Sequence, residues 1–183
     1  IVNENGRGFD TFGDLWRALR RQLREDAGLS ARLHARNDVV MPQECACLLG
    51  SLFTNDCIDR GRSIIDGGAR YSGACIMGHG FSNAADALLA IRRLVFEQAE
   101  VDQPTLLAAL DADFEGHEEL QQRLLAMPKF GNDNDEVDAL LNDLWHEVNV
   151  AADEMGQREG LTFLTVSSVN PGGFHFGKLC GAT

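Results

Sequence analysis

Histidine, cysteine and acidic side chains are the groups in this sequence of 183 residues that could do chemistry, and their spacing restricts that chemistry. His146 and Glu147 begin a zinc-protease motif, but Val150 stands where the second histidine ligand is needed. A second His-Glu pair at residues 117–118 fails in the same way. The five histidines show no paired spacing, so the sequence predicts no metal site.

The cysteines also argue against a metal site or a disulfide framework. Their number is odd and their spacing is irregular, which favours reduced thiols in the cytoplasm. Cys45 and Cys47 lack the two-residue gap of a zinc knuckle or a thioredoxin-type site. We expect buried or incidental thiols at all five positions, which are Cys45, Cys47, Cys57, Cys75 and Cys180.

Two loops superficially suggest ligand binding. Residues 78–83 (GHGFSN) half-match a dinucleotide loop, but the third glycine is missing and no acidic residue follows a second strand at the right distance. Residues 131–135 (GNDND) suggest calcium, but they lack the loop of twelve residues with Gly at position six and Glu at position twelve. Asn and Asp side chains satisfy free amides at a helix N-terminus, so this turn is better explained as a helix start.

Composition and charge exclude further classes of protein. The net charge of −12 argues against nucleic acid or an anionic membrane as a partner, because both need a basic face. No apolar run approaches the roughly 20 residues of a membrane span, and residues 1–8 contain no signal peptide. These residues also lack a starting Met, so we expect a chain that is entered in mid-course. The reduced thiols favour the cytoplasm as its location.

Amphipathic helices alternate with tight turns along the chain. Thr11 to Asp14 resemble a capping box with Asp in place of Glu, which predicts a helix start. Apolar residues then recur at helical spacing, at Phe12, Leu15, Trp16, Leu19 and Leu23. Further helices are predicted from Pro42 through Leu49, from Asn55 to Ser63, from Ser82 or Asn83 with a stripe at Ala84, Leu88, Ile91 and Val95, from Asp102 through Leu110, and from Gly116 to Met127.

The longest predicted helix begins at Asn132 or Asp133 and ends at Gly160. Its apolar residues repeat at steps of four and three, which makes a continuous helical seam. Residues 161–168 (LTFLTVSS) then have the β-branched and aromatic content of a strand. Residues 67–71 (GGARY) predict a turn that feeds a short extended segment.

This pattern predicts an α/β fold that is mostly helical and forms part of something larger. One or two strands cannot bury the apolar faces of six or seven helices. The missing strands must come from elsewhere in a larger protein, or the helices pack on one another instead.

Several stretches resemble the glycyl radical enzymes, the family of pyruvate formate-lyase, glycerol and hydroxyproline dehydratases and choline trimethylamine-lyase. They follow the order of the family's motifs across about residues 9–183, with Ser72 where Asn is usual. The stretches are residues 51–61 (SLFTNDCIDRG) with 67–71 (GGARY), 85–91 (ADALLAI), 109–116 (ALDADFEG), 130–138 (FGNDNDEVD) and 174–183 (FHFGKLCGAT).

The resemblance implies a barrel of two parallel five-stranded halves wrapped by helices. Residues 1–183 would be an internal section of one pyruvate formate-lyase-like domain, truncated at both ends. Two loops meet at the centre of such a barrel, one with the cysteine that becomes a thiyl radical and one with the glycine that stores the radical. The cysteine loop precedes the matched region and the glycine loop follows it, so we assign no catalytic residue and no metal ligand to this chain.

Substrate contacts are expected after the last predicted strand, where a barrel points its loops at its centre. The candidates are Ser167, Ser168, Asn170 and His175. Hydroxyl and amide groups there could orient a small polar substrate. Ordinary strand-to-loop turn chemistry is the alternative explanation.

The resemblance implies an enzyme of anaerobic metabolism that cleaves or dehydrates a small polar metabolite, as a lyase or a formate C-acetyltransferase. No cofactor is expected in this chain, which should be inactive alone. The parent would carry a glycyl radical installed by a separate activating enzyme that uses S-adenosylmethionine and an iron–sulfur cluster. The alternatives are a non-catalytic truncated homologue and one chain of a split enzyme, which would act through a partner chain or by self-association.

Overall fold

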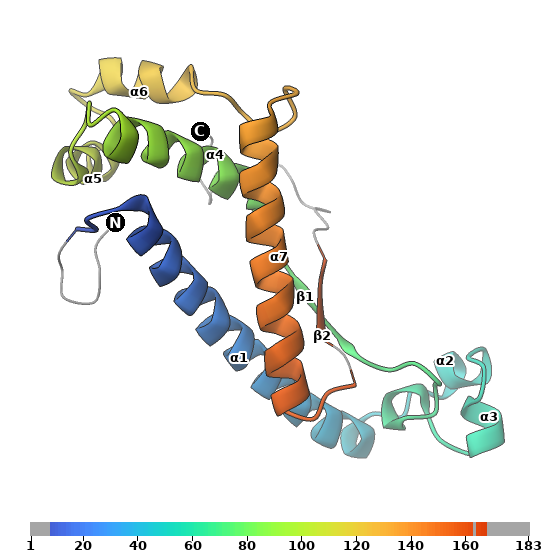
Figure 1. Cartoon of the computed structure of the whole chain (residues 1–183). Coiled ribbons are helices and arrows are strands. Elements are labelled where there is room, and N and C mark those ends of the chain that lie inside the picture. The colour runs from blue at the N-terminus through green and yellow to red at the C-terminus, as the bar shows by residue number, and fades with distance from the viewer. Residues whose placement is uncertain (1–7, 163, 168–183) are drawn as a thin grey trace. The chain divides into compact units, whose positions relative to one another are not determined.

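The computed structural model describes residues 8–162 and 164–167 (Figure 1). The described residues form two compact units, of which the first contains residues 8–21 and 78–147 and the second contains the remainder. Most of these residues are helical, and the two described strands form a small parallel sheet. The predicted fold class is confirmed.

Helices make up most of both units. The first unit contains the start of α1 (Phe12–Glu44), α4 (Phe81–Ile91), η2 (Arg92–Glu97), α5 (Gln103–Asp111), α6 (Glu118–Leu125) and the start of α7 (Asp135–Arg158). The second unit contains the remainder of α1 and α7, together with α2 (Leu48–Leu52), α3 (Cys57–Arg60), η1 (Ile64–Asp66), β1 (Ala74–Met77) and β2 (Leu164–Ser167).

A capping box starts α1, as the sequence predicts. The backbone N–H of Thr11 donates to Asp14 Oδ2 at 3.1 Å, and the backbone N–H of Asp14 donates to Thr11 Oγ1 at 3.1 Å. Each side chain therefore satisfies an amide that a helix start leaves without a partner. The prediction that Pro42 opens a second helix is wrong, because Pro42 lies inside α1. It lies two residues before the end of the helix at Glu44, so the backbone hydrogen bond that Pro42 cannot donate affects only the last turn.

Helix α4 begins differently from the prediction. Its N-cap is Gly80, with a φ of 77°, rather than Ser82 or Asn83. Glycine adopts this left-handed conformation without steric cost. The helix then widens into η2, a π-helix in which Gln98 N donates to Arg93 O at 2.8 Å. The apolar spacing does not predict this widening, because it follows the period of an α-helix.

Asp102 caps α5, as predicted. Its side chain accepts a hydrogen bond from Thr105 N at 2.8 Å, and hydrogen bonds from Thr105 lower the pKa of the Asp102 carboxyl. Pro104 lies in the first turn, where its missing N–H leaves no helical hydrogen bond unmade. The helix predicted from Gly116 to Met127 is shorter than expected, because α6 begins at Glu118 and ends at Leu125.

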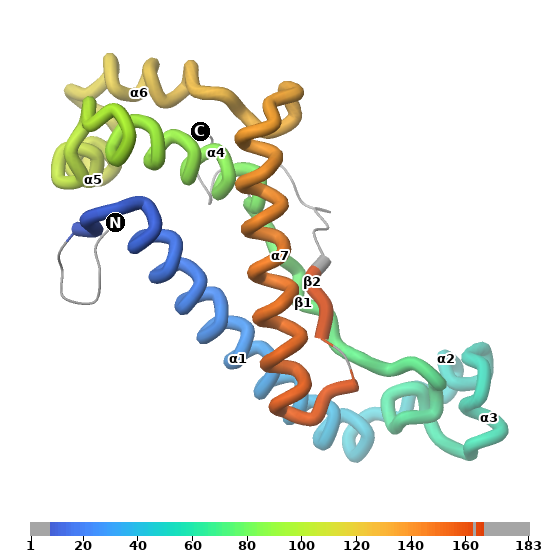
Figure 2. The backbone as a smooth tube through the Cα atoms, in the orientation of Figure 1, coloured from blue at the N-terminus to red at the C-terminus, as the bar shows by residue number. Residues whose placement is uncertain are grey.

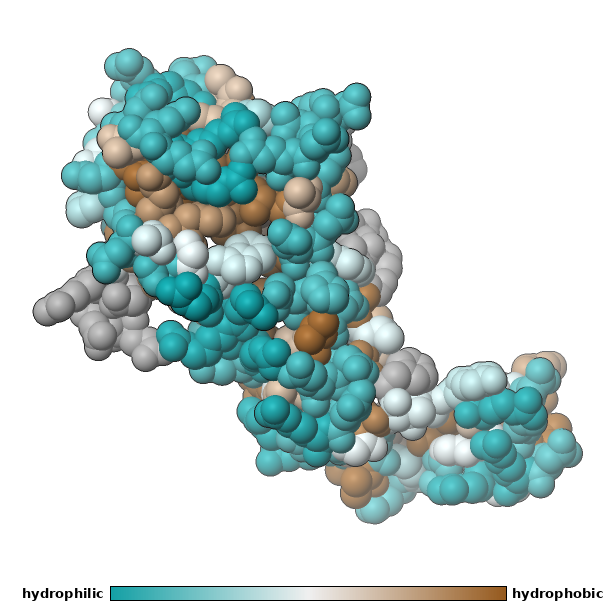
Figure 3. All heavy atoms as spheres, in the orientation of Figure 1, coloured by the Kyte–Doolittle hydropathy of each residue, from teal (hydrophilic) through white to brown (hydrophobic). Residues whose placement is uncertain are grey.

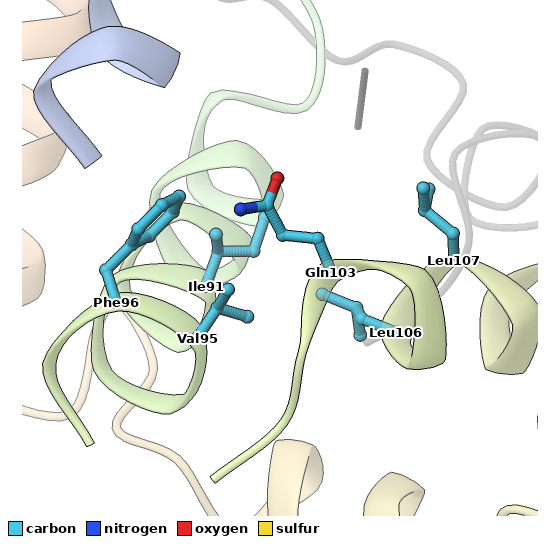
Figure 4. A pocket seen from close by; sticks show the side chains of 6 residues that line it. All are labelled: Ile91, Val95, Phe96, Gln103, Leu106 and Leu107. Carbon is cyan, nitrogen blue, oxygen red and sulfur yellow. The ribbon is translucent and has the colours of Figure 1, made fainter. Parts of the chain in front are cut away.

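A buried apolar cluster joins η2, α5 and α6 in the first unit. Figure 4 shows Ile91, Val95 and Phe96 facing Gln103 and Leu106 of α5. The buried members of the cluster are Val101, Leu106, Ala109 and Leu120. This packing holds three short helices together that would be marginal in isolation.

The first unit also contains a polar contact between Phe9 and Gln103 and an apolar hollow beside α4 and α6. The side-chain amide of Gln103 pairs with the backbone of Phe9, accepting from its N–H at 2.8 Å and donating to its carbonyl oxygen at 2.6 Å. Hydrophobic residues gather between α4 and α6 on the face shown in Figure 3, around a hollow of about 140 Å³. The segment before α1 is thus attached to α5 by polar contacts, while α4 and α6 meet through apolar side chains.

Helix α7 begins at Asp135 rather than at Asn132 or Asp133. Its cap is Asn134, whose Oδ1 accepts hydrogen bonds from the N–H groups two and three residues further on, at 3.2 and 3.3 Å. The prediction that an Asn or Asp side chain caps this helix is right in residue type, but the capping residue lies one or two positions later than predicted. Gly160 follows the end of the helix with a φ of 77°, as expected of a helix stop.

The strands β1 and β2 pair in parallel, with Ala74 opposite Leu164 and Met77 opposite Ser167. They lie side by side in both Figure 1 and Figure 2. Strand β2 confirms the strand predicted within residues 161–168, and β1 is the short extended segment predicted after the turn. Parallel strands need a long crossover connection, and here that connection contains α4 to α7.

Removing the hydroxyl of Thr11 should raise the pKa of the Asp14 carboxyl. The hydrogen bond from Thr11 is the largest cause that holds this pKa below its ordinary value of 3.8, and Arg17 lowers it further. Such a carboxylate stabilises the fold above its ordinary pKa, and this contribution is lost as the pH falls through the lowered value. In Thr11→Ala, the NMR titration midpoint of Asp14 should therefore rise toward 3.8, and by more than in Arg17→Ala. An unchanged midpoint would contradict the capping box.

Candidate functional site

The carboxyl ends of β1 and β2 form the edge at which the sequence predicts a site. Parallel pairing puts Met77 opposite Ser167, so both strands end at the same edge. In barrel enzymes the loops that follow this edge carry the binding groups. Ser167 is the last residue of β2, whereas Ser168, Asn170 and His175 lie outside the described residues.

Helix α7 covers one face of the strand pair at very short range. A Cβ atom at Gly156 would lie 2.7 Å from Leu164 Cβ, which is closer than two carbon atoms pack. Leu164 and Val166 are buried, and so is Ala74 opposite Leu164. A glycine at position 156 is what lets the helix approach the strand this closely.

The other face of the strand pair is exposed. Cys75, Met77 and Thr165 are exposed, and they alternate along the strands with buried or half-buried residues. Cys75 lies opposite Thr165 in register. The three side chains carry a thiol, a thioether and a hydroxyl, and none of them is charged. The sequence alone does not single out these three residues, because four residues give too short an alternation to tell one face of a strand from the other.

The turn before β1 depends on a close backbone contact. A Cβ atom at Gly68 would lie 2.2 Å from the carbonyl oxygen of Arg62, so the predicted turn needs a glycine at this position. Arg62 Nη2 lies 3.1 Å from Asp66 Oδ1, and this hydrogen bond lowers the pKa of the Asp66 carboxyl. The helix predicted from Asn55 to Ser63 is wrong in extent, because α3 has only four residues between left-handed residues at each end.

A polar hollow of about 650 Å³ lies beside this turn. At its wall, Arg70 Nη2 donates to Asp56 Oδ1 at 3.2 Å, and Arg70 Nε lies 3.1 Å from Asp56 Oδ2. The pair joins the two halves of the motif that spans residues 51–71. The hollow is lined by Phe53, Thr54, Asn55, Asp56, Asp59, Ala69, Arg70 and Tyr71. It lies toward the amino end of β1, away from the edge where the site is predicted.

Two other motif stretches contact each other in the first unit. Asp86 of α4 is 9% exposed and accepts a hydrogen bond from Phe130 N at 2.7 Å. Glu136 of α7 pairs with both Arg92 and Arg93 of η2. These carboxylates fix the turn and the first residues of α7 against α4 and η2, so the motif residues that are placed here hold the fold together.

The described residues offer no metal centre. Within residues 8–162 and 164–167, no three His, Cys, Asp or Glu side chains lie close enough to hold a metal ion. Of the described cysteines, Cys57 is buried, and Cys45, Cys47 and Cys75 are exposed and free. No helix in the same described ranges is long and apolar enough to cross a membrane.

Known proteins that are similar in sequence or structure include several dehydratases. Residues 2–172 match the protein family described as pyruvate formate lyase-like. YbiW, a probable dehydratase of Escherichia coli, is 39% identical over 140 residues, which are 75% of this chain and 17% of that protein. The structure of hydroxyproline dehydratase from Clostridioides difficile with trans-4-hydroxy-L-proline bound has a TM-score of 0.74 and 32% identity, over 79% of this chain and 18% of that one. The glycerol-bound B12-independent glycerol dehydratase of Clostridium butyricum has a TM-score of 0.83 and 27% identity, over 100% of this chain and 24% of that one.

The chain therefore belongs to the pyruvate formate lyase-like family of glycyl radical enzymes, as its motifs predict. Its fold is a section of the barrel of these enzymes. It spans less than a quarter of the length of the relatives that it matches.

Replacing Gly156 by alanine should cost more stability than the matched replacement of Gly28. Both glycines are buried in helices of the second unit, and each substitution gains about 1 kcal/mol of helix propensity. At Gly28 the new methyl group would meet Met155 Sδ at an ordinary 3.5 Å, whereas at Gly156 it collides with Leu164. Overpacking costs about 1–3 kcal/mol, so Gly156→Ala should have a free energy of unfolding lower than that of Gly28→Ala by this amount. Urea unfolding measures both, and equal values would contradict the close contact of α7 with β2.

Replacing Asp86 by alanine should lower the free energy of unfolding by about 0.5–1.5 kcal/mol, because Phe130 N loses its acceptor. Asp86→Asn keeps an acceptor oxygen and should retain most of the stability. Asp111→Ala, at an exposed position on α5, is the control and should stay within about 0.5 kcal/mol of the parent. A loss in Asp86→Asn as large as in Asp86→Ala would show that the charge matters more than the hydrogen bond.

Proposed function

We propose that this chain is a section of a glycyl radical enzyme that dehydrates or cleaves a small polar metabolite, and that it is inactive alone. The observation that carries the proposal is the strand pair β1–β2, which has one face packed on α7 and the other face exposed. Parallel sheets are stable with both faces covered. The pair is therefore suited to a barrel wall, where the further strands of a longer polypeptide enclose a chamber.

Radical chemistry explains why the section should not act by itself. Hydrogen abstraction needs the radical and the substrate carbon in contact within a closed, dry site. None of the five cysteines follows a glycine, as the cysteine of the family's loop usually does. We propose that the parent carries a glycyl radical, installed in the cytoplasm by a separate activating enzyme that uses S-adenosylmethionine and an iron–sulfur cluster.

Within the parent, we assign substrate orientation to the segment that follows β2. Ser167, Ser168, Asn170 and His175 lie at or just after the carboxyl end of a strand that has a parallel neighbour. Hydroxyl and amide groups suit the hydroxyl groups of a small metabolite better than an apolar substrate. The relatives described above favour dehydration over the formate C-acetyltransferase reaction.

A partner chain is the second candidate, and it is raised by exposed apolar side chains on α1, on α2 and at Phe53, the residue after α2. Large exposed apolar patches mark surfaces that other protein segments cover. In a split enzyme a separate chain would cover them, and in a single long enzyme the same polypeptide would do so. They are Leu29, Leu33, Val39, Val40, Met41, Leu48, Leu49, Leu52 and Phe53.

The decisive experiment uses the longest protein that the coding sequence encodes in frame around residues 1–183. We expect it to contain a Gly-Cys loop upstream and a radical glycine loop downstream. After anaerobic activation it should give the electron paramagnetic resonance signal of a glycyl radical, and it should consume a small hydroxylated compound. Stop codons that close the frame on both sides would reject a single-chain enzyme, and copurification with a second chain would then identify the split form.

Residues 1–183 expressed alone should self-associate, because apolar side chains of α1 and α2 and one face of the strand pair are exposed in the part of the chain that the structure describes. Sedimentation velocity should show species larger than a monomer, and Leu49→Glu with Phe53→Glu should reduce them. Leu89→Glu is not a suitable comparison, since Leu89 is fully buried. Asp59→Lys, which changes charge at an exposed position nearby, is the control. A monomer that melts cooperatively would instead support an independent, non-catalytic domain.

A further inference from the structure

The bare face of β1 and β2 has a defined set of side chains. Along β1, Ala74 is buried and Ile76 is half-buried, while Cys75 is exposed and Met77 is 58% exposed. Along β2, Thr165 is exposed between two buried residues and lies opposite Cys75. Side chains of a strand alternate between its faces, so Cys75, Met77 and Thr165 share the face that α7 does not cover.

The position of α7 decides which way this face points in a barrel. Gly156 lies against Leu164, so the helix covers the buried face at contact distance. In a barrel of parallel strands the helices form the outer ring, and the opposite face of every strand points inward. The bare face is therefore the interior face of the barrel wall.

The interior of this barrel has room for more than its own side chains. About eight strands give an interior that side chains just fill or that holds one small ligand, and the diameter grows with the number of strands. The ten strands implied by the family resemblance therefore enclose a wider space. Side chains on the interior face line that space and contact what is bound there.

We propose that Cys75, Met77 and Thr165 line the substrate chamber of the parent enzyme and contribute to its specificity. This inference rests on the proposed function. None of the three is charged, so this wall suits the carbon skeleton and a neutral hydroxyl group of the substrate. Any charged group of the substrate must be bound by other walls. Thr165 is the one member of the set with a hydroxyl group, and it forms a hydrogen bond with a hydroxyl group of the substrate. Cys75 and Met77 pack against the carbon atoms of the substrate.

Alkylation of Cys75 tests the inference without any substitution. The full-length protein is treated with iodoacetamide, alone and with saturating glycerol or trans-4-hydroxy-L-proline, and labelled thiols are identified by mass spectrometry. Cys75 should lose most of its labelling in the presence of the compound that the activated enzyme consumes. Cys47, exposed between α1 and α2, is the matched control and should label equally in both conditions.

Thr165→Val tests the contact by kinetics, with Thr162→Val as control at an exposed position before β2. Loss of one hydrogen bond should raise KM by about 2- to 10-fold in Thr165→Val and leave it unchanged in Thr162→Val. An active enzyme whose Cys75 labelling and Thr165→Val KM are both unaffected would overturn this inference and leave the proposed function intact. A full-length protein that forms no glycyl radical would reject the proposed function.

Discussion

The close approach of α7 to β2 at Gly156 is the constraint on which the second unit depends. A side chain at that position would collide with Leu164, so the helix and the strand can touch because residue 156 is a glycine. The contact buries one face of a parallel strand pair beside Ala74 and Val166. It also determines which side chains lie on the opposite face. Side chains of a strand alternate between its two faces, so those that do not point toward α7 lie on the other face. The division of the sheet into a structural face and an open face therefore follows from one backbone contact.

The motifs that identify the family are mostly structural in the residues described. Asp86 accepts a hydrogen bond from Phe130, which joins two of the motif stretches across the first unit. Asn134 caps α7, and Arg70 pairs with Asp56 across the stretch before β1. Buried or cap hydrogen bonds are costly to lose, which is a sufficient physical reason for these residue types to stand in these positions.

This separation is consistent with the proposal that the chain is a section of a radical enzyme. The helices of the first unit have a core of their own, and in the second unit Gly156 lets α7 lie directly against β2. The two strands present an uncharged exposed face and end at one edge, where polar residues follow in the sequence. A face of this kind suits the proposed radical chamber, because a closed and weakly polar chamber excludes water from the reaction.

The sequence by itself determined the family, the helical character, the capping of α1 and α5, and the strand after residue 160. These features depend on neighbours in the chain, such as Thr11 with Asp14 or Asp102 with Thr105, and on the order of motifs. Tertiary structure decided the features that depend on distant residues. Pro42 stays within α1, α4 begins after Gly80 and widens into a π-helix, and α3 is confined to four residues. It also decided which residues of β1 and β2 lie on the open face, because four residues alternate equally well in either direction until α7 packs on one side.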